Sequence, residues 1–209
     1  MNIIRPSYTW NSSLAYRTKT DYIVLHHRAG NGDVLSIHDQ HLKQGWSGIG
    51  YHYYIRKNGA IYGGRPESTK GAHCINYNSN SIGICFEGNY ETETTMPQVQ
   101  IRAGQELISY LRGKYPSAKV VGHRDLYATA CPGKYFPSEA ILSKTTQTDT
   151  TNKTNTTLKK EDEVMTQEKA IQTLINKARL SDTTITFLQC YKYGNELIIK
   201  LAEAINKGV

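Results

Sequence analysis

Cysteine is scarce in this sequence, and long apolar runs are absent. The four cysteines, Cys74, Cys85, Cys131 and Cys190, form no CxxC pair, which argues against a dense disulfide framework and favours reduced thiols from a cytosolic site of synthesis. No apolar stretch approaches about 18 residues, so the sequence predicts no transmembrane segment. The N-terminus, MNIIRPSYTW, lacks a charged region followed by an apolar run, so we expect no signal peptide and synthesis in the cytoplasm.

Phenylalanine is also scarce, with 3 residues against 15 tyrosines, a residue suited to half-wet surfaces and clefts. The net charge is +7, and the excess lies in residues 1–144, which hold 16 basic and 10 acidic residues. Such a balance favours a polyanionic partner, either nucleic acid or an anionic cell wall, or serves solubility alone. Because no nucleic-acid-binding motif and no dense basic run is present, we expect no nucleic acid partner.

One break in composition divides the chain. Residues 145–163 read TTQTDTTNKTNTTLKKEDE, with eight threonines and almost nothing apolar. Such a stretch cannot bury enough surface to offset the entropy of ordering, which is typical of a linker. The sequence therefore predicts a larger domain over residues 1–144 and a small second domain over residues 164–209.

The first domain alternates strand and helix signals, which predicts an α/β fold with helices on the faces of a sheet. The expected strands are 22–25, 51–55, 60–62, 81–86 and 120–121, the second and third forming a hairpin around Asn58-Gly59. The expected helices are 33–44 and 97–115, and the longer one carries an apolar stripe of Val99, Ile101, Leu107, Ile108 and Leu111.

The tail instead predicts a small all-α unit of two or three helices. Residues 167–178 place Ile171, Leu174, Ile175 and Ala178 on one face, and 194–206 do the same with Ile198, Leu201, Ala202 and Ile205. Between them, Ser181 is an expected N-cap for a helix through Cys190. Since some forty residues make a marginal core, we expect this unit to dimerise or to dock on the first domain.

Three residues suggest a metal site at strand ends. His26 ends an apolar strand, His123 follows Val120-Val121-Gly122, and Cys131 lies eight residues beyond His123. Ligand sites collect at such strand ends, and two imidazoles with one thiolate suit Zn²⁺ with a fourth position open to water. The alternative is ordinary: a strand-end histidine often only makes a structural hydrogen bond, and a lone cysteine before proline is often a small buried apolar residue.

Four segments, in order over residues 22–137, carry a family resemblance. They are IVLHH at 23–27, GYHY at 50–53, GAH at 71–73 with YNSNSIGI at 77–84, and GHRD at 122–125 through ACPG at 130–133. The sequence thus resembles the zinc-dependent N-acetylmuramoyl-L-alanine amidases (amidase type 2), a family that includes phage lysozyme-type amidases and peptidoglycan recognition proteins. The resemblance implies a central mixed β-sheet flanked by helices, and one Zn²⁺ held by His26, His123 and Cys131.

The same resemblance implies hydrolysis of the amide bond between N-acetylmuramic acid and L-alanine in peptidoglycan. A non-catalytic peptidoglycan recognition module is the rival interpretation. Members without catalysis commonly lose the cysteine ligand, so the presence of Cys131 favours an enzyme. The choice of His26 over His27 as ligand also comes from the resemblance, because strand alternation says only that the two point to opposite faces.

Further site residues follow from the resemblance, each with a structural alternative. Tyr51 is expected beside the reacting water and oxyanion, or as a strand tyrosine bonded to a neighbour. Thr129 stands where some members have lysine, and is expected to donate one neutral hydrogen bond to the transition state or to bond to backbone. Glu87 lies one pleat repeat beyond the position of a distant relative's general base, so it is either catalytic or an outer carboxylate. By resemblance, His73 and Asn80 are expected to line the substrate groove. The planar guanidinium of Arg65 is suited to contact a substrate carboxylate. The alternative for each of the three is a surface loop residue.

The overall organisation resembles that of a phage or prophage endolysin of a Gram-positive host. Such an enzyme is made in the host cytoplasm and acts on the cell wall after release. We expect the C-terminal unit to hold the enzyme on the bacterial cell-wall surface through a flexible tether, or to form a homodimer. An autolysin exported by another route is the alternative.

Overall fold

The computed structural model describes residues 1–143, 167–178, 184 and 194–207. The chain divides into two compact units, residues 1–148 and 149–209, which are taken separately below. Among the described residues, no helix combines the length and the apolar character needed to cross a membrane.

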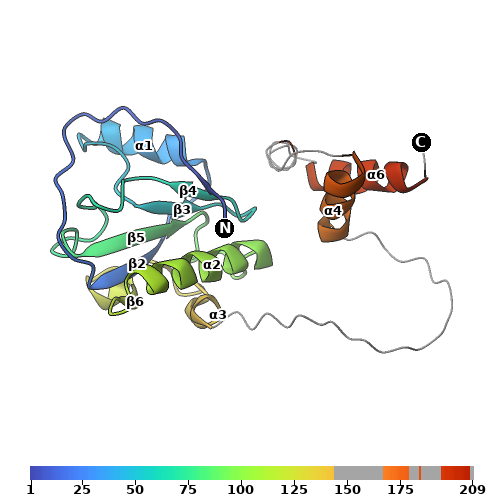
Figure 1. Ribbon diagram of the computed structural model, residues 1–209. Helices are drawn as coiled ribbons and strands as arrows, with labels where there is room; N and C mark the ends of the chain where they lie inside the picture. The colour runs from blue at the N-terminus through green and yellow to red at the C-terminus, as the bar shows by residue number, and fades with distance from the viewer. Residues whose placement is uncertain (144–166, 179–183, 185–193, 208–209) are drawn as a thin grey trace. The chain divides into compact units, whose positions relative to one another are not determined.

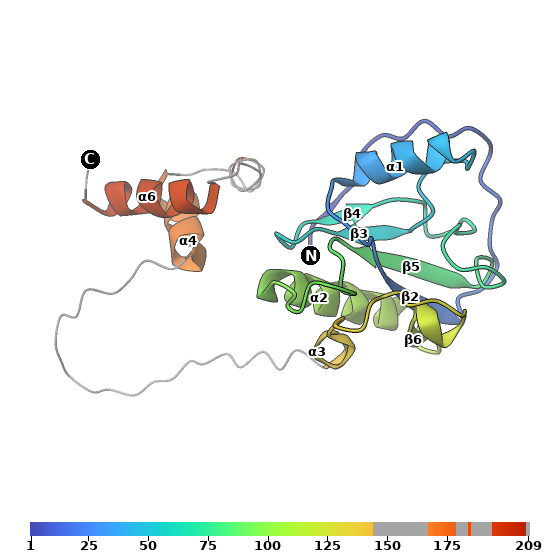
Figure 2. The same cartoon turned by 180° about the vertical axis from the view of Figure 1, so that it is seen from behind.

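The first unit is built on a six-stranded mixed sheet in the order β1-β4-β3-β5-β2-β6. The strands are β1 (Ile3–Ile4), β2 (Tyr22–His27), β3 (Tyr53–Ile55), β4 (Ile61–Gly63), β5 (Ser81–Phe86) and β6 (Lys119–Gly122). The helices are α1 (Val34–Lys43), α2 (Gln98–Lys114), the single 3₁₀ turn η1 (His123–Asp125) and α3 (Ser138–Leu142). Figures 1 and 2 show α1 and α2 on opposite sides of the strands. The predicted mixed sheet with flanking helices is confirmed.

Side-chain alternation along the strands gives the sheet two different faces. Ile23, Leu25, Ile82, Ile84 and Phe86 point to one face, where they pack with the apolar side of α2 and with α3. This cluster is the larger core of the unit, and most of its members are almost completely buried. The face that carries α2 is therefore filled largely by apolar packing.

The opposite face is only partly covered by a helix. Val34 and Ile37 of α1 pack against Ile49, Tyr54 and Cys85. Asp33 starts this helix, because its side chain accepts a hydrogen bond from the Ser36 backbone N–H (2.7 Å).

The differences from the predicted elements have local causes. The hairpin strand begins at Tyr53 rather than Tyr51, and its partner ends at Gly63. The predicted Asn-Gly turn is present: the Asn58 side chain accepts from the Ala60 N–H (3.1 Å), and Gly59 has a φ of +84°, which favours glycine. β1, η1 and α3 were not predicted, because two to five residues are too few to show a hydrophobic period.

The second unit contains α4 (Gln167–Ala178) and α6 (Gly194–Lys207), both predicted from sequence. They pack through a small cluster of Ala170, Leu174, Ile198 and Ala202. The predicted faces are wrong in detail, since Ala178 and Leu201 are exposed and Ala170 is buried. The helix predicted from Ser181 to Cys190 falls, except for Thr184, outside the described residues.

Candidate metal centre

Strand register brings the two candidate histidine ligands together. β2 lies between β5 and β6, parallel to both, and Leu25 pairs with Gly122 of β6. The next residue of each segment is a histidine, so His26 and His123 meet at the carboxyl ends of adjacent strands, with ring centroids 4.5 Å apart. This is the edge of an α/β sheet where ligand sites collect.

Cys131 reaches the same point by a local turn. The Arg124 backbone N–H donates to the carbonyl of Cys131 (2.9 Å), and the Arg124 guanidinium donates to the carbonyl of Ala130 (2.9 Å). These bonds fold residues 130–131 back onto η1, which follows β6 directly. The Cys131 Sγ consequently lies 3.7 Å from His26 Nδ1.

The three side chains form a group able to hold one metal ion. Their ligand atoms all lie within 4.8 Å of one another. His123 Nε2 is buried and has no hydrogen-bond partner within the described part of the chain, which is unusual for a polar atom. Burial, with repulsion from His123 and His27, lowers the pKa of His26 well below its usual range, and burial also lowers the pKa of His123, so both imidazoles are neutral as coordination requires.

The thiol supports the same interpretation. Burial raises the pKa of Cys131 to about 11, so a thiolate at neutral pH needs a cation beside it. Two neutral imidazoles and a thiol that one cation would ionise are a fitting donor set for Zn²⁺. The predicted ligands therefore lie together, and their chemistry suits the predicted metal.

His27 lies on the other face of the sheet. It pairs with Phe86, on the α2 side, whereas His26 pairs with Cys85. The His27 Nδ1 accepts a hydrogen bond from the Tyr90 backbone N–H (3.0 Å). This placement agrees with the expectation that His26 and His27 point to opposite faces of the sheet.

A cavity of about 370 Å³ opens beside this group. Of the predicted residues, it is lined by Tyr51, His73 and His123. Sequence reasoning missed the rest of the lining: Trp46, Ala72, Cys74, Ile75, Asn78 and Tyr127. Trp46, Ile75 and Tyr127 are more than two-fifths exposed, and an exposed aromatic or aliphatic residue has no signature in a single sequence.

Tyr51 contacts both the metal group and the sheet. Its ring lies 5.2 Å from that of His26, between centroids, and it packs against the apolar cluster that contains Cys85 of β5. Burial, followed by the neighbouring Cys85 and Cys131, raises the pKa of Tyr51 well above its usual value, so the hydroxyl stays a donor. The Thr129 hydroxyl accepts from the Cys131 backbone N–H (3.3 Å), which leaves its own proton free to donate.

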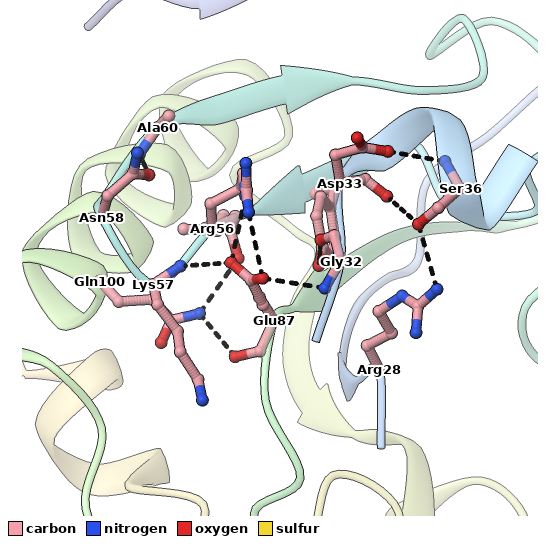
Figure 3. A network of polar contacts seen from close by, with 12 residues as sticks. Arg28, Gly32, Asp33, Ser36, Arg56, Lys57, Asn58, Ala60, Glu87 and Gln100 are labelled. Atoms are coloured by element: carbon pink, nitrogen blue, oxygen red, sulfur yellow. Dashed lines mark hydrogen bonds and ion pairs between the residues drawn. The ribbon is translucent and has the colours of Figure 1, made fainter. Parts of the chain in front are cut away.

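Glu87 is engaged elsewhere. Its buried carboxylate accepts from the backbone N–H groups of Gly32 (3.0 Å) and Lys57 (2.9 Å), and from the Arg56 guanidinium (3.2 and 3.4 Å), as Figure 3 shows. Burial alone would raise the pKa of Glu87, but Arg56 and the two backbone donors lower it. A carboxylate held ionised by a guanidinium and backbone donors is a poor general base, and no predicted zinc ligand belongs to this network.

Arg65 and Asn80 also lie outside the cavity lining. The buried Arg65 donates to the carbonyls of Ile49 (2.7 Å) and Lys70 (2.8 Å), so its guanidinium fixes two loops. Asn80 precedes β5, at the opposite end of the strand from Cys85, and donates to the Asp21 carboxylate (2.8 Å). Their contacts give no support to the expectations that Asn80 lines the substrate groove and that Arg65 contacts substrate.

The fold and the site define an α/β protein with a His₂Cys group able to hold a metal ion at the carboxyl ends of its central strands, beside an open cavity. The model of the family described as N-acetylmuramoyl-L-alanine amidase matches residues 16–134. The chain therefore belongs to the N-acetylmuramoyl-L-alanine amidase family.

Individual relatives agree with this assignment. Peptidoglycan-recognition protein SC2 of Drosophila simulans is 39% identical over 140 residues, 61% of this chain and 74% of the relative. The endolysin of Enterobacteria phage K11 is 36% identical over 103 residues, 47% of this chain and 68% of the relative. Among solved structures, N-acetylmuramoyl-L-alanine amidase LysC from Clostridium intestinale URNW is similar with a TM-score of 0.65 and 41% identity, covering 68% of this chain and 95% of LysC.

Proposed function

We propose that this chain is a zinc-dependent hydrolase of the amide bond between N-acetylmuramic acid and L-alanine in peptidoglycan. The observation that carries the proposal is the His26, His123 and Cys131 group, whose ligand atoms lie within 4.8 Å of one another in a member of the amidase family. When bound there, Zn²⁺ supplies Lewis acidity, which brings the pKa of a coordinated water to about 7 and polarises a carbonyl.

The protein's own side chains would stabilise the charge that develops on the scissile carbonyl. Tyr51 keeps its proton because its phenol is buried, so it can donate to the oxyanion. Thr129 can add a second, neutral donor, since its oxygen already accepts from the Cys131 backbone. Trp46 and Tyr127 line the cavity beside the three ligands and offer apolar surface to a bound substrate.

A recognition module without catalysis is the second candidate, because peptidoglycan-recognition proteins are among the relatives. The complete ligand set, including Cys131, favours the enzyme. Purified cell wall incubated with the zinc-loaded protein should release new alanine amino groups and free muramic carboxylates, detected by mass spectrometry. A wild-type protein that binds wall but releases neither product would establish the recognition module instead.

The second unit and the biological setting belong to the same proposal. We infer that α4 and α6 form part of a unit that holds the enzyme on the bacterial cell wall, with a homodimer as the alternative. The similarity to phage endolysins supports an endolysin that is made in the host cytoplasm and reaches the wall after release. The Gram-positive host stays a prediction from the sequence.

A further inference from the structure

A second buried histidine is bonded directly to one of the proposed metal ligands. His73 Nδ1 lies 3.0 Å from His26 Nε2, with the two rings nearly perpendicular at 83°. Both side chains are buried. The predicted role of His73 was a contact with substrate, but this bond ties its ring to the metal group itself.

The direction of the hydrogen bonds around His73 can be deduced by starting from the Tyr77 carbonyl, which bonds to Ser81, which in turn bonds to His73. The carbonyl oxygen of Tyr77 can only accept, so the Ser81 hydroxyl, 2.6 Å away, donates to it. The Ser81 oxygen then accepts from His73 Nε2, at 3.4 Å. A neutral imidazole carries one N–H, so His73 Nδ1 is left as an acceptor.

The same logic fixes the neighbouring ring. Because His73 Nδ1 accepts, His26 donates from its Nε2–H. A neutral His26 then has its lone pair on Nδ1, the nitrogen that lies 3.7 Å from Cys131 Sγ. The hydrogen bonds that start at the Tyr77 carbonyl therefore select the His26 tautomer whose free lone pair lies on the nitrogen near Cys131 Sγ.

We propose that His73 is a positioning residue that holds His26 in the tautomer and orientation needed for metal binding, with Ser81 and the Tyr77 carbonyl completing the relay. The inference rests on the proposed function, since it assigns a role toward the same metal. Partners of this kind orient ligand histidines and raise their basicity, and their loss typically costs about 10- to 100-fold in metal affinity.

The backbone around His73 is shaped to fix its ring. A Cβ on Gly83 of β5 would lie 2.6 Å from ring atoms of His73, and one on Gly71 would lie 2.4 Å from its Cδ2, so only glycine leaves the space. The loop that carries His73 is held as well, because Asn78 Oδ1 accepts from the backbone N–H groups of His73 (2.8 Å) and Cys74 (2.9 Å). A ring clamped in this way suits an orienting role better than a side chain that adapts to substrate.

Zinc affinity of the full-length protein tests the proposal without any substrate. The metal is removed with a chelator, and Zn²⁺ is returned in competition with a chromophoric chelator of known affinity. His73→Ala should weaken zinc binding about 10- to 100-fold. His73→Asn should recover most of that loss, because the Asn Oδ1 takes the place of the ring Nδ1 as acceptor.

His38→Ala is the matched control. His38 is a buried histidine that donates to the Thr9 carbonyl (3.0 Å) and accepts from the Ile49 N–H (3.1 Å), and it contacts none of the three ligands. Its loss should lower the melting temperature and leave zinc affinity within about threefold of the wild type. Circular dichroism of each variant shows whether it is folded during the titration.

A tautomer measurement on the wild type keeps the proposal testable even if His73→Ala does not fold. Long-range ¹⁵N–¹H correlation of the metal-free protein should show His26 and His73 both protonated at Nε2. Protonation of His26 at Nδ1, or a folded His73→Ala that binds zinc as tightly as the wild type, would overturn the positioning role while leaving the proposed hydrolysis intact. A wild type with no zinc affinity would overturn both.

Discussion

The variant Glu87→Gln tests whether the Glu87 carboxylate has a structural or a catalytic role. The carboxylate accepts four hydrogen bonds from the loops that follow β2 and β3, so it ties together the carboxyl ends of three neighbouring strands. Glu87→Gln keeps the shape but replaces one acceptor oxygen with an NH₂ group, which cannot accept. Two of the four bonds are then lost whichever way the amide turns, and the Arg56 charge loses its partner.

The cost of Glu87→Gln can be worked from these contacts. Hydrogen bonds to a charged group contribute about 1.5–3 kcal/mol each, and breaking a fully buried pair costs about 3–5 kcal/mol. Arg56 is 29% exposed, so water compensates part of the loss and we expect about 2–4 kcal/mol. For a unit of this size that corresponds to a fall in melting temperature of roughly 5–15 °C.

The pH dependence of this difference has a defined sign. The folded-state pKa of Glu87 is lowered from its ordinary value of 4.5, so its contribution to stability is complete above that value and is lost as the pH falls through the folded-state pKa. The stability gap between the wild type and Glu87→Gln should therefore be largest near neutral pH and shrink in acid. Denaturant unfolding at several pH values measures it.

Activity completes the test of Glu87. Glu93→Gln is the control, because Glu93 pairs with Lys57 at the surface and should cost less than about 1 kcal/mol. Well below the melting temperature, wall hydrolysis by Glu87→Gln should stay within about threefold of the wild type, since no bond to the metal group is lost. A variant with unchanged melting temperature and activity reduced by more than 100-fold would refute the structural role and restore Glu87 as a catalytic group.

Three further predictions concern the metal group and the second unit. Tyr51→Phe should lower kcat by about 100-fold, the usual effect of losing one oxyanion donor, and keep the zinc content measured by atomic emission; equal loss of zinc would contradict a donor role. His27→Ala should lower the melting temperature by several degrees and retain one zinc per chain, whereas zinc loss would mean that the sheet faces are assigned wrongly. Removal of residues 145–209 should weaken sedimentation with purified wall while the cleavage of soluble muropeptides persists; undiminished wall binding would end the targeting role.

Strong local patterns were predicted well from the sequence. The apolar run that ends at His26, the turn at Asn58-Gly59 and the stripe on α2 each depend on neighbours in the chain, and each is present, the stripe with one exception. The α2 stripe fails at one position. Gln100 is buried where Val99 was expected, because its amide donates to the carbonyls of Ile55 and Glu87 and accepts from the Tyr90 hydroxyl.

Partners distant in sequence account for what could not be predicted. In the sequence, Glu87, Arg65 and Asn80 are only polar residues near motif segments. Their partners in the fold cannot be identified from the sequence: Arg56 for Glu87, the Ile49 carbonyl for Arg65 and Asp21 for Asn80. The three candidate ligands do lie together, with ligand atoms within 4.8 Å of one another, because each follows directly from a strand end or a turn beside it. Substrate contacts are harder to predict from a family pattern, because a groove accepts many arrangements of side chains.

The position of the three candidate ligands depends on the difference between the two faces of the sheet. On the α2 face, the His27 Nδ1 accepts a hydrogen bond from the Tyr90 backbone N–H. On the other face α1 packs over Tyr54 of β3 and Cys85 of β5, while the cavity beside His26 is walled by loop residues and by His123. One strand step therefore separates a histidine that belongs to the core from one that can bind a metal. A register shift of one residue in β2 would exchange the positions of His26 and His27. The burial of Ile23 and Leu25 on the α2 side prevents that shift, so these two core residues matter to the chemistry as much as the ligands do.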